Sequence, residues 1–188
     1  MLASEKKFSI EELLATEATR WDRRIASDLA AELETQLAEK LETIPEIRRL
    51  LAVKGYRELR ARLERDIGNA TGSDAIRAMA LAMRAFAHER PGLSAATFRN
   101  SMTDSPEWRR EGELLAAIAV RVFVSDGLNR EQAITALQIL RALVRGFVLH
   151  EMTASFLDTV DYNQIYAVAV DVFIRGLDAL RPAAQPAC

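Results

Sequence analysis

The side chains that could carry out chemistry are few and scattered along the sequence. His150 and Glu151 begin like a zinc-protease helix, but the second histidine of that motif would stand at position 154, which is alanine. The other histidine is His88, and the single cysteine is Cys188, so neither a disulfide nor a zinc cluster can be built. The sequence also lacks a glycine-rich phosphate loop and a Glu-x-x-His di-iron motif. It therefore predicts no catalytic residue, no metal site, no cofactor and no enzyme.

A second group of side chains suits the binding of a small molecule. Met79, Met83 and Phe86 recur at i, i+4 and i+7, which places them on one side of a helix. Such stripes usually belong to a core, but methionine and aromatic residues also line adaptable apolar cavities. The candidate ligand-binding residues, taken from three predicted helices, are Met79, Met83, Phe86, Trp108, Ile118, Val122, Phe147 and His150.

These residues must be positioned by helices, because the composition favours no other element. The chain has 188 residues, of which 49% are hydrophobic, with only 8 glycines and 5 prolines. That length predicts one domain, and the scarcity of turn residues argues against strands. The formal net charge of −2 offers no bulk attraction to nucleic acid or to an anionic membrane. No apolar run is long enough to span a membrane, so the prediction is an all-α cytoplasmic protein.

Start and stop signals divide the chain into six or seven helices. Capping residues are expected at Ser9, Thr43, Ser73, Ser105, Asn129 and Asp161. Gly55 is a candidate position for a bend, Arg90-Pro91-Gly92 is expected to end a helix, and residues 182–188 are expected to form a tail. The expected helices span residues 9–42, 43–67, 73–87, 94–102, 106–125, 129–156 and 161–181.

The last two predicted helices are apolar around most of their circumference. Ten of the fourteen residues from Ala136 to Leu149 are apolar, as are ten of the thirteen from Ile165 to Leu177. A helix without a polar face is either central in the fold or covered by another subunit, and both readings stay open. The second predicts a homodimer through a four-helix contact, which small residues at Ala142 and Gly146 would let pack closely. The residues expected in this interface are Leu140, Val144, Val148, Val170, Phe173, Ile174 and Leu177.

Three segments resemble the C-terminal regulatory domain of TetR/AcrR-type transcriptional regulators. They are Arg84–Leu93, Leu140–Glu151 and Val172–Leu177, and the resemblance extends over residues 56–181. The chain has Arg145-Gly146-Phe147 where a similar subgroup often has His-Gly-Phe. The resemblance implies a helical bundle of six to seven or more helices, a homodimer formed by the last two, and a pocket for a small apolar or mixed-polarity effector.

The same family carries a three-helix DNA-binding head, and residues 1–55 are atypical in that place. No glycine precedes Gly55, so the tight turn of a helix-turn-helix has no obvious residue. Residues 1–48 carry seven basic and eleven acidic side chains, a net charge of −4, whereas a phosphate-binding surface is locally basic. The predicted organisation is an altered head at 1–55, a ligand-binding and dimerisation domain at 56–181 and a tail. The alternative to a DNA-binding regulator is a headless sensor or protein-interaction module.

Overall fold

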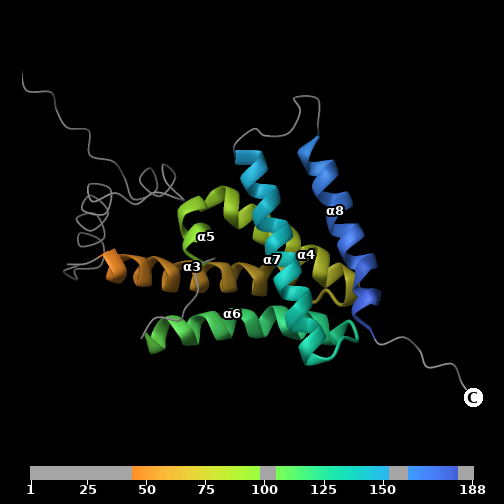
Figure 1. The fold of residues 1–188 in the computed structure, drawn as a ribbon, viewed down its shortest axis with the longest axis horizontal. Coiled ribbons are helices and arrows are strands. Elements are labelled where there is room, and N and C mark those ends of the chain that lie inside the picture. The colour runs from red at the N-terminus through yellow and green to blue at the C-terminus, as the bar shows by residue number, and fades with distance from the viewer. Residues whose placement is uncertain (1–43, 98–104, 153–160, 182–188) are drawn as a thin grey trace, which may run out of the picture. The chain divides into compact units, whose positions relative to one another are not determined.

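The computed structural model describes residues 44–97, 105–152 and 161–181, and within these ranges all regular secondary structure is helical (Figure 1). The expected all-α fold is confirmed. The predicted helix over residues 9–42 lies outside the described residues, as does the tail. In the labels of Figure 1 the helices are α3 (Ile44–Ile67), α4 (Gly72–Glu89), α5 (Pro91–Thr97), α6 (Pro106–Ser125), α7 (Arg130–Met152), α8 (Tyr162–Gly176) and the 3₁₀ helix η1 (Leu177–Leu180).

The chain divides into two compact units. Unit 1 comprises residues 1–59 and 86–113, and unit 2 comprises residues 60–85 and 114–188. The divisions fall inside α3, α4 and α6, each of which contributes to both units. The boundary expected after residue 55 lies within α3, and the division into head, effector domain and tail stays a prediction.

Local capping chemistry explains where the later helices begin. Ser105 Oγ accepts a hydrogen bond from the Trp108 amide at 3.3 Å, as expected for the start of α6. Asn129 and Gln132 form a reciprocal box, in which each backbone amide donates to the other residue's side chain, at 2.8 and 2.9 Å. Asp161 accepts from the amides of residues 163 and 164 and so caps α8. These three predicted caps are confirmed, whereas Ser9 and Thr43 lie outside the described residues. The expected cap at Ser73 is wrong, because α4 already begins at Gly72 and Ser73 lies in its first turn.

Two predicted helix boundaries are wrong. Arg90-Pro91-Gly92 was expected to end one helix, and the next helix was expected to begin at residue 94. Helix α5 instead begins at Pro91. Proline suits the first position of a helix, where its fixed φ is helical and its missing amide hydrogen has no role. The last predicted helix, 161–181, instead changes at Leu177 from α to 3₁₀ geometry, the tighter winding that often ends a helix.

Unit 1 is held together around α3 and α5. Its buried residues include Leu51, Tyr56 and Leu93. Gly55 permits a close approach, because a Cβ added there would lie 2.8 Å from the backbone oxygen of Leu93 and 2.9 Å from Cγ2 of Thr97. The structure therefore gives Gly55 a packing role, and α3 continues past it.

Unit 2 has its core between α4, α6, α7 and α8. Its most deeply buried large side chains include Met79, Phe123, Leu140 and Tyr166. Helices α7 and α8 contact each other and lie side by side in Figure 1. Among the described residues, α7 is the one helix long and apolar enough to cross a membrane by length and composition, a test that core helices of soluble proteins also pass.

Candidate functional site

Helices α7 and α8 each bury one face and expose another that is also apolar. The residues expected in a dimer interface lie on the buried face: Leu140, Val144, Val148, Val170, Phe173 and Leu177 are buried within the chain, and Ile174 is half-buried. A partner copy would therefore meet the opposite face of these helices. The role assigned to the seven residues stays a prediction, and their side chains are occupied in packing the chain's own core.

The exposed face of α8 carries an apolar stripe of Ile165, Val168 and Val172, spaced at i, i+3 and i+7. Val172 is 62% exposed and Val168 56%, which is unusual for valine in a helix of a folded protein. The stripe continues to Gly176, and a Cβ added there would have no atom within 4 Å.

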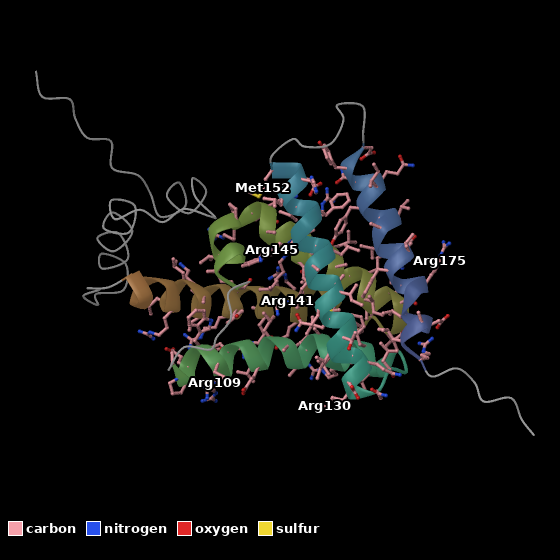
Figure 2. The ribbon with its side chains drawn as sticks, viewed as in Figure 1. Arg109, Arg130, Arg141, Arg145, Met152 and Arg175 are labelled. Atoms are coloured by element: carbon pink, nitrogen blue, oxygen red, sulfur yellow. The ribbon has the colours of Figure 1, made fainter. Side chains whose placement is uncertain are left out.

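The exposed face of α7 repeats this arrangement. Ile139 and Leu149 are exposed, and Ala142 and Gly146 fall between them at the same helical spacing. A Cβ added at Gly146 would also meet nothing within 4 Å, and the close helix approach expected there in a dimer stays a prediction. Figure 2 labels Met152 at the end of α7, together with Arg141 and Arg145 on α7 and Arg175 on α8. We call the apolar residues on this outer face the apolar stripe; seven of them are exposed and Gly146 is half-buried: Ile139, Ala142, Gly146, Leu149, Ile165, Val168, Val172 and Gly176.

Polar contacts that the sequence analysis missed connect α4 to α7 and α8. The Arg84 guanidinium pairs with the Glu151 carboxylate, with Nε and Oε2 3.0 Å apart, and its Nη1 donates to Oδ1 of Asn163 at 3.0 Å. The side chains of Arg84 and Glu151 are 14% and 7% exposed, so the pair is largely withdrawn from water. The guanidinium also lies 4.8 Å from the centre of the Tyr166 ring.

Tyr166 extends this contact into the core of unit 2. It is fully buried, its hydroxyl donates to the backbone oxygen of Ala80 at 2.7 Å, and its ring meets Phe147 edge-on with centres 5.0 Å apart. Burial raises the pKa of Tyr166 above its ordinary value, an effect that the Arg84 charge opposes and the Glu151 charge reinforces. The phenol is therefore held in its neutral, hydrogen-bond-donating form.

A third contact completes an antiparallel register between α4 and α8. Arg77 Nη2 lies 2.6 Å from Oδ1 of Asp171, and Arg77 also pairs with Asp74 on its own helix. The residues of α4 that make these contacts are, in chain order, Arg77, Ala80 and Arg84. Their partners on α8 follow in the reverse order, Asp171, Tyr166 and Asn163, so the two helices run antiparallel. We call these three contacts the α4–α8 clamp.

The candidate ligand-binding residues are placed as follows. In unit 2, Met79, Met83, Ile118, Val122 and Phe147 are buried, whereas His150 is exposed. In unit 1, Phe86 and Trp108 are buried. Their roles in ligand binding stay predictions, and the exposure of His150 makes it the least suited of the set to an interior site.

Unit 1 contains an ionic cluster between α3 and α6. Arg57 bonds to Oε1 of Glu111 at 2.9 Å and to Oε1 of Glu107 at 3.1 Å, and Arg49 bonds to Oε2 of Glu107 at 2.8 Å. The hydrogen bond that Arg57 donates to Glu111 and the charges of both acids raise the pKa of Arg57, against a smaller opposing effect of burial. Nearby, the Nε1 atom of buried Trp108 has no hydrogen-bond partner among the described residues.

Nothing in the described ranges resembles a metal centre. No group of three histidine, cysteine, aspartate or glutamate residues that could hold an ion occurs in residues 44–97, 105–152 and 161–181. The polar side chains described above form ion pairs and helix caps.

Comparisons with known proteins agree with this architecture. Residues 76–173 match the family model described as the tetracyclin repressor-like C-terminal domain. The chain is 29% identical over 162 residues to an uncharacterized HTH-type transcriptional regulator of Mycobacterium tuberculosis (strain ATCC 25618 / H37Rv), covering 84% of this chain and 74% of the relative. A solved structure of a protein with unknown function from Rhodococcus sp. RHA1 shares the fold, with a TM-score of 0.66, 19% identity and coverage of 94% of this chain and 98% of that one. The chain therefore belongs to the tetracyclin repressor-like family of transcriptional regulators.

Proposed function

We propose that this regulator is a cytoplasmic homodimer that binds a small apolar or mixed-polarity effector in its C-terminal part and DNA through its N-terminal segment. The observation that carries the proposal is the apolar stripe on α7 and α8, in a chain whose family model matches a C-terminal domain. A regulator of this kind needs no catalytic residue, and the described contacts are structural.

Dimerisation is supported by where the exposed apolar side chains lie. Among the residues that the structure describes, all ten large hydrophobic residues with high exposure belong to unit 2, and seven of them are on α7 or α8: Ile134, Ile139, Leu149, Met152, Ile165, Val168 and Val172. Exposed apolar residues gathered on neighbouring helices mark an interaction surface. A two-fold contact would pair the stripe with itself, and the small residues Ala142 and Gly146 would let two helices approach closely.

The dimer is tested with adjacent residues on opposite faces of α8. Val172→Glu places a charge in the apolar stripe, and we expect it to convert the dimer to a folded monomer, as measured by light scattering at micromolar concentration. Phe173→Glu instead buries a charge in the core, since Phe173 is 8% exposed, and we expect it to unfold unit 2. A wild-type monomer, or a Val172→Glu dimer as tight as wild type, would contradict this interface.

Effector binding is supported by the buried methionine, aromatic and branched side chains of α4, α6 and α7. Such residues can repack around an apolar guest, and a ligand bound only to the folded state raises the melting temperature. A thermal-shift screen of hydrophobic small molecules tests this part of the proposal. A chain whose melting temperature responds to none of them would be a dimerisation scaffold.

DNA binding is supported by the extent of the alignment. The aligned 84% of the chain leaves out fewer residues than the 43 that precede α3, so the similarity to an HTH-type regulator reaches into the N-terminal segment. The second candidate is a sensor or protein-interaction module without DNA binding. The net charge of −4 over residues 1–48 and the absence of a glycine before Gly55 favour that alternative.

A further inference from the structure

The outer face of α8 carries opposite charges at its two ends. Asp161 stands just before the first turn and Arg175 stands in the last turn, and both residues are exposed. Oδ1 of Asp161 accepts from the amides of residues 163 and 164, and the second carboxylate oxygen has no hydrogen bond within the described chain. Arg175 forms no ion pair with any residue that the structure describes, and Figure 2 shows it pointing away from α7.

The remaining charges of this part of the chain are already engaged. Asp171 of α8 pairs with Arg77 of α4, and Asp178 of η1 pairs with Arg181. Asp161 and Arg175 are therefore the two charged groups that α8 can offer to another molecule.

These two charges are placed symmetrically about Val168. Asp161 lies seven residues before Val168 and Arg175 lies seven residues after it, which is about two helical turns in each direction. The three residues therefore share one side of the helix, and the exposed side chains of Ile165 and Val172 lie between them. This face thus has an apolar centre, an acid at one end and a base at the other.

Such a face is complementary to a second copy of itself when the two helices run antiparallel. In a two-fold contact, residue i meets residue j of the partner copy, and j meets i. Antiparallel helices that cross at Val168 bring Asp161 to the partner's Arg175 and Arg175 to the partner's Asp161. Parallel helices would bring each charge against its own copy, which is repulsive.

The two ion pairs also require a shallow crossing. At 1.5 Å per residue, each charge lies about 10 Å along the axis from Val168. Helices that cross at about 20° stay close over that length, whereas a crossing of about 50° separates their ends. Valine side chains at the centre are short and let the two helices approach.

We propose that α8 pairs with α8 of a second copy in an antiparallel register, with Val168 on the two-fold axis and Asp161 of each copy paired with the partner's Arg175. The inference rests on the proposed function, and it names the register of the dimer. The apolar centre supplies most of the affinity, because exposed ion pairs contribute little. The charges instead select the direction and the register, since every other alignment leaves them unpaired or opposed.

Charge variants of the full-length protein test the ion pairs, with the dissociation constant of the dimer measured by sedimentation of fluorescently labelled chains. Arg175→Glu turns two attractions into two repulsions, and should raise that constant about tenfold at low salt and less at about 1 M salt. Asp161→Asn removes the charge but keeps a side chain that caps helices well. It should weaken the wild-type dimer about threefold, yet tighten the Arg175→Glu dimer about threefold. Arg121→Glu, the same change at an exposed arginine of α6, is the control and should have no effect.

Disulfide trapping tests the position of the axis. In a Cys188→Ala background, Val168→Cys places the single thiol of the chain where it meets its own copy. Val172→Cys is the control, because in this register the two thiols would lie about 12 Å apart along the axis, beyond the reach of a disulfide. Mild oxidation should therefore cross-link Val168→Cys at least about tenfold faster than Val172→Cys.

The outcomes separate the register from the dimer itself. If Asp161→Asn acts in the same direction with and without Arg175→Glu, or if positions 168 and 172 cross-link equally fast, the register is overturned in a chain that still dimerises. If Glu131→Gln on α7 relieves the effect of Arg175→Glu and Asp161→Asn does not, the partner of Arg175 lies on α7 and the register is also overturned. A wild-type monomer would overturn the proposed dimer together with this inference.

Discussion

Arg77 and Arg84 lie two turns apart on α4 and make the same kind of contact in different surroundings. Arg84 and Glu151 are 14% and 7% exposed, whereas Arg77 and Asp171 are 42% and 38% exposed. Removing one partner of a buried pair leaves an uncompensated charge, while an exposed pair contributes little because water screens it. The two arginines therefore form a matched test of what an ion pair made by α4 contributes when it is buried and when it is exposed.

We expect Arg84→Met to lower the free energy of unfolding by about 3 kcal/mol and Arg77→Met to lower it by less than about 1 kcal/mol. Urea denaturation of each variant measures both effects. The double variant Arg84→Met/Glu151→Met should recover most of the loss, since it removes both buried charges. Equal losses in the two single variants would show that the burial of Arg84 has no energetic consequence.

Tyr166 gives unit 2 a predictable response to alkaline pH. Its pKa is raised in the folded chain, so the unfolded state releases the phenolic proton first, at about pH 10. Stability should therefore be fully present below about pH 10 and fall above it by about 1.4 kcal/mol per pH unit from this one group. In Tyr166→Phe this component of the loss disappears, as denaturation at a series of alkaline pH values would measure.

Tyr162→Phe is the control for that experiment. It removes a phenol from the first turn of α8 without touching the bond between Tyr166 and the Ala80 carbonyl. The control should keep the alkaline loss that Tyr166 causes. If Tyr166→Phe and wild type lose stability in parallel, the raised pKa of Tyr166 has been assigned to the wrong residue.

At the scale of the helices, the sequence was sufficient where the determinant was local. The reciprocal box of Asn129 and Gln132, and the Asp161 cap, join residues at most three positions apart, and both were predicted. Pro91 was misread because proline both ends one helix and suits the first turn of the next. The all-α class followed from composition and capping, which need no tertiary information.

What could not be predicted depends on contacts between distant segments. With ten of fourteen residues apolar in the middle of α7, periodicity cannot say which side is buried, and the predicted interface fell on the core side. Glu151, which pairs with Arg84, is 67 residues away in the sequence, and an arginine among apolar neighbours does not by itself indicate which acid it pairs with. The sequence indicates only that a charged residue among apolar neighbours needs an opposite charge or a hydrogen-bond partner when it is buried.

Glycine substitutions separate helix packing from helix propensity. Gly55→Ala should lower the free energy of unfolding by about 1–3 kcal/mol, because the added Cβ would lie 2.8 Å from the Leu93 backbone oxygen. Gly176→Ala adds the same atom in open space at helical φ and ψ, and should leave stability unchanged or raise it by up to about 1 kcal/mol. Thermal and urea denaturation of both variants measure these changes in stability. Equal effects would mean that the contact between α3 and α5 is not close in solution.

At the scale of the whole molecule, the proposed dimer and the proposed DNA binding would be linked. A two-fold dimer would present two identical N-terminal segments to two half-sites related by the same symmetry. Residues 1–48 carry a net charge of −4, so non-specific attraction to phosphates is weak, and affinity for DNA would have to come from two specific contacts made at once. Loss of the dimer should therefore cost far more in DNA affinity than in fold stability.

Selection from a random duplex DNA library with the full-length chain tests this linkage. We expect the wild type to enrich a palindromic sequence with half-sites one or two helical turns apart, and to bind it as a dimer in a gel-shift titration. Val172→Glu, which is directed at the apolar stripe of α8, should remain folded but lose at least a hundredfold in affinity for that sequence, because the avidity of paired half-sites is typically 10²–10⁴. Val124→Glu is the matched control, since it places the same charge on a comparably exposed valine of α6, and it should bind like the wild type.

Two results would contradict this linkage. If the wild-type dimer enriches no DNA sequence, the function that remains for this chain is a sensor without DNA binding. If Val172→Glu is monomeric and binds the selected sequence with unchanged affinity, DNA binding does not depend on the α7–α8 interface.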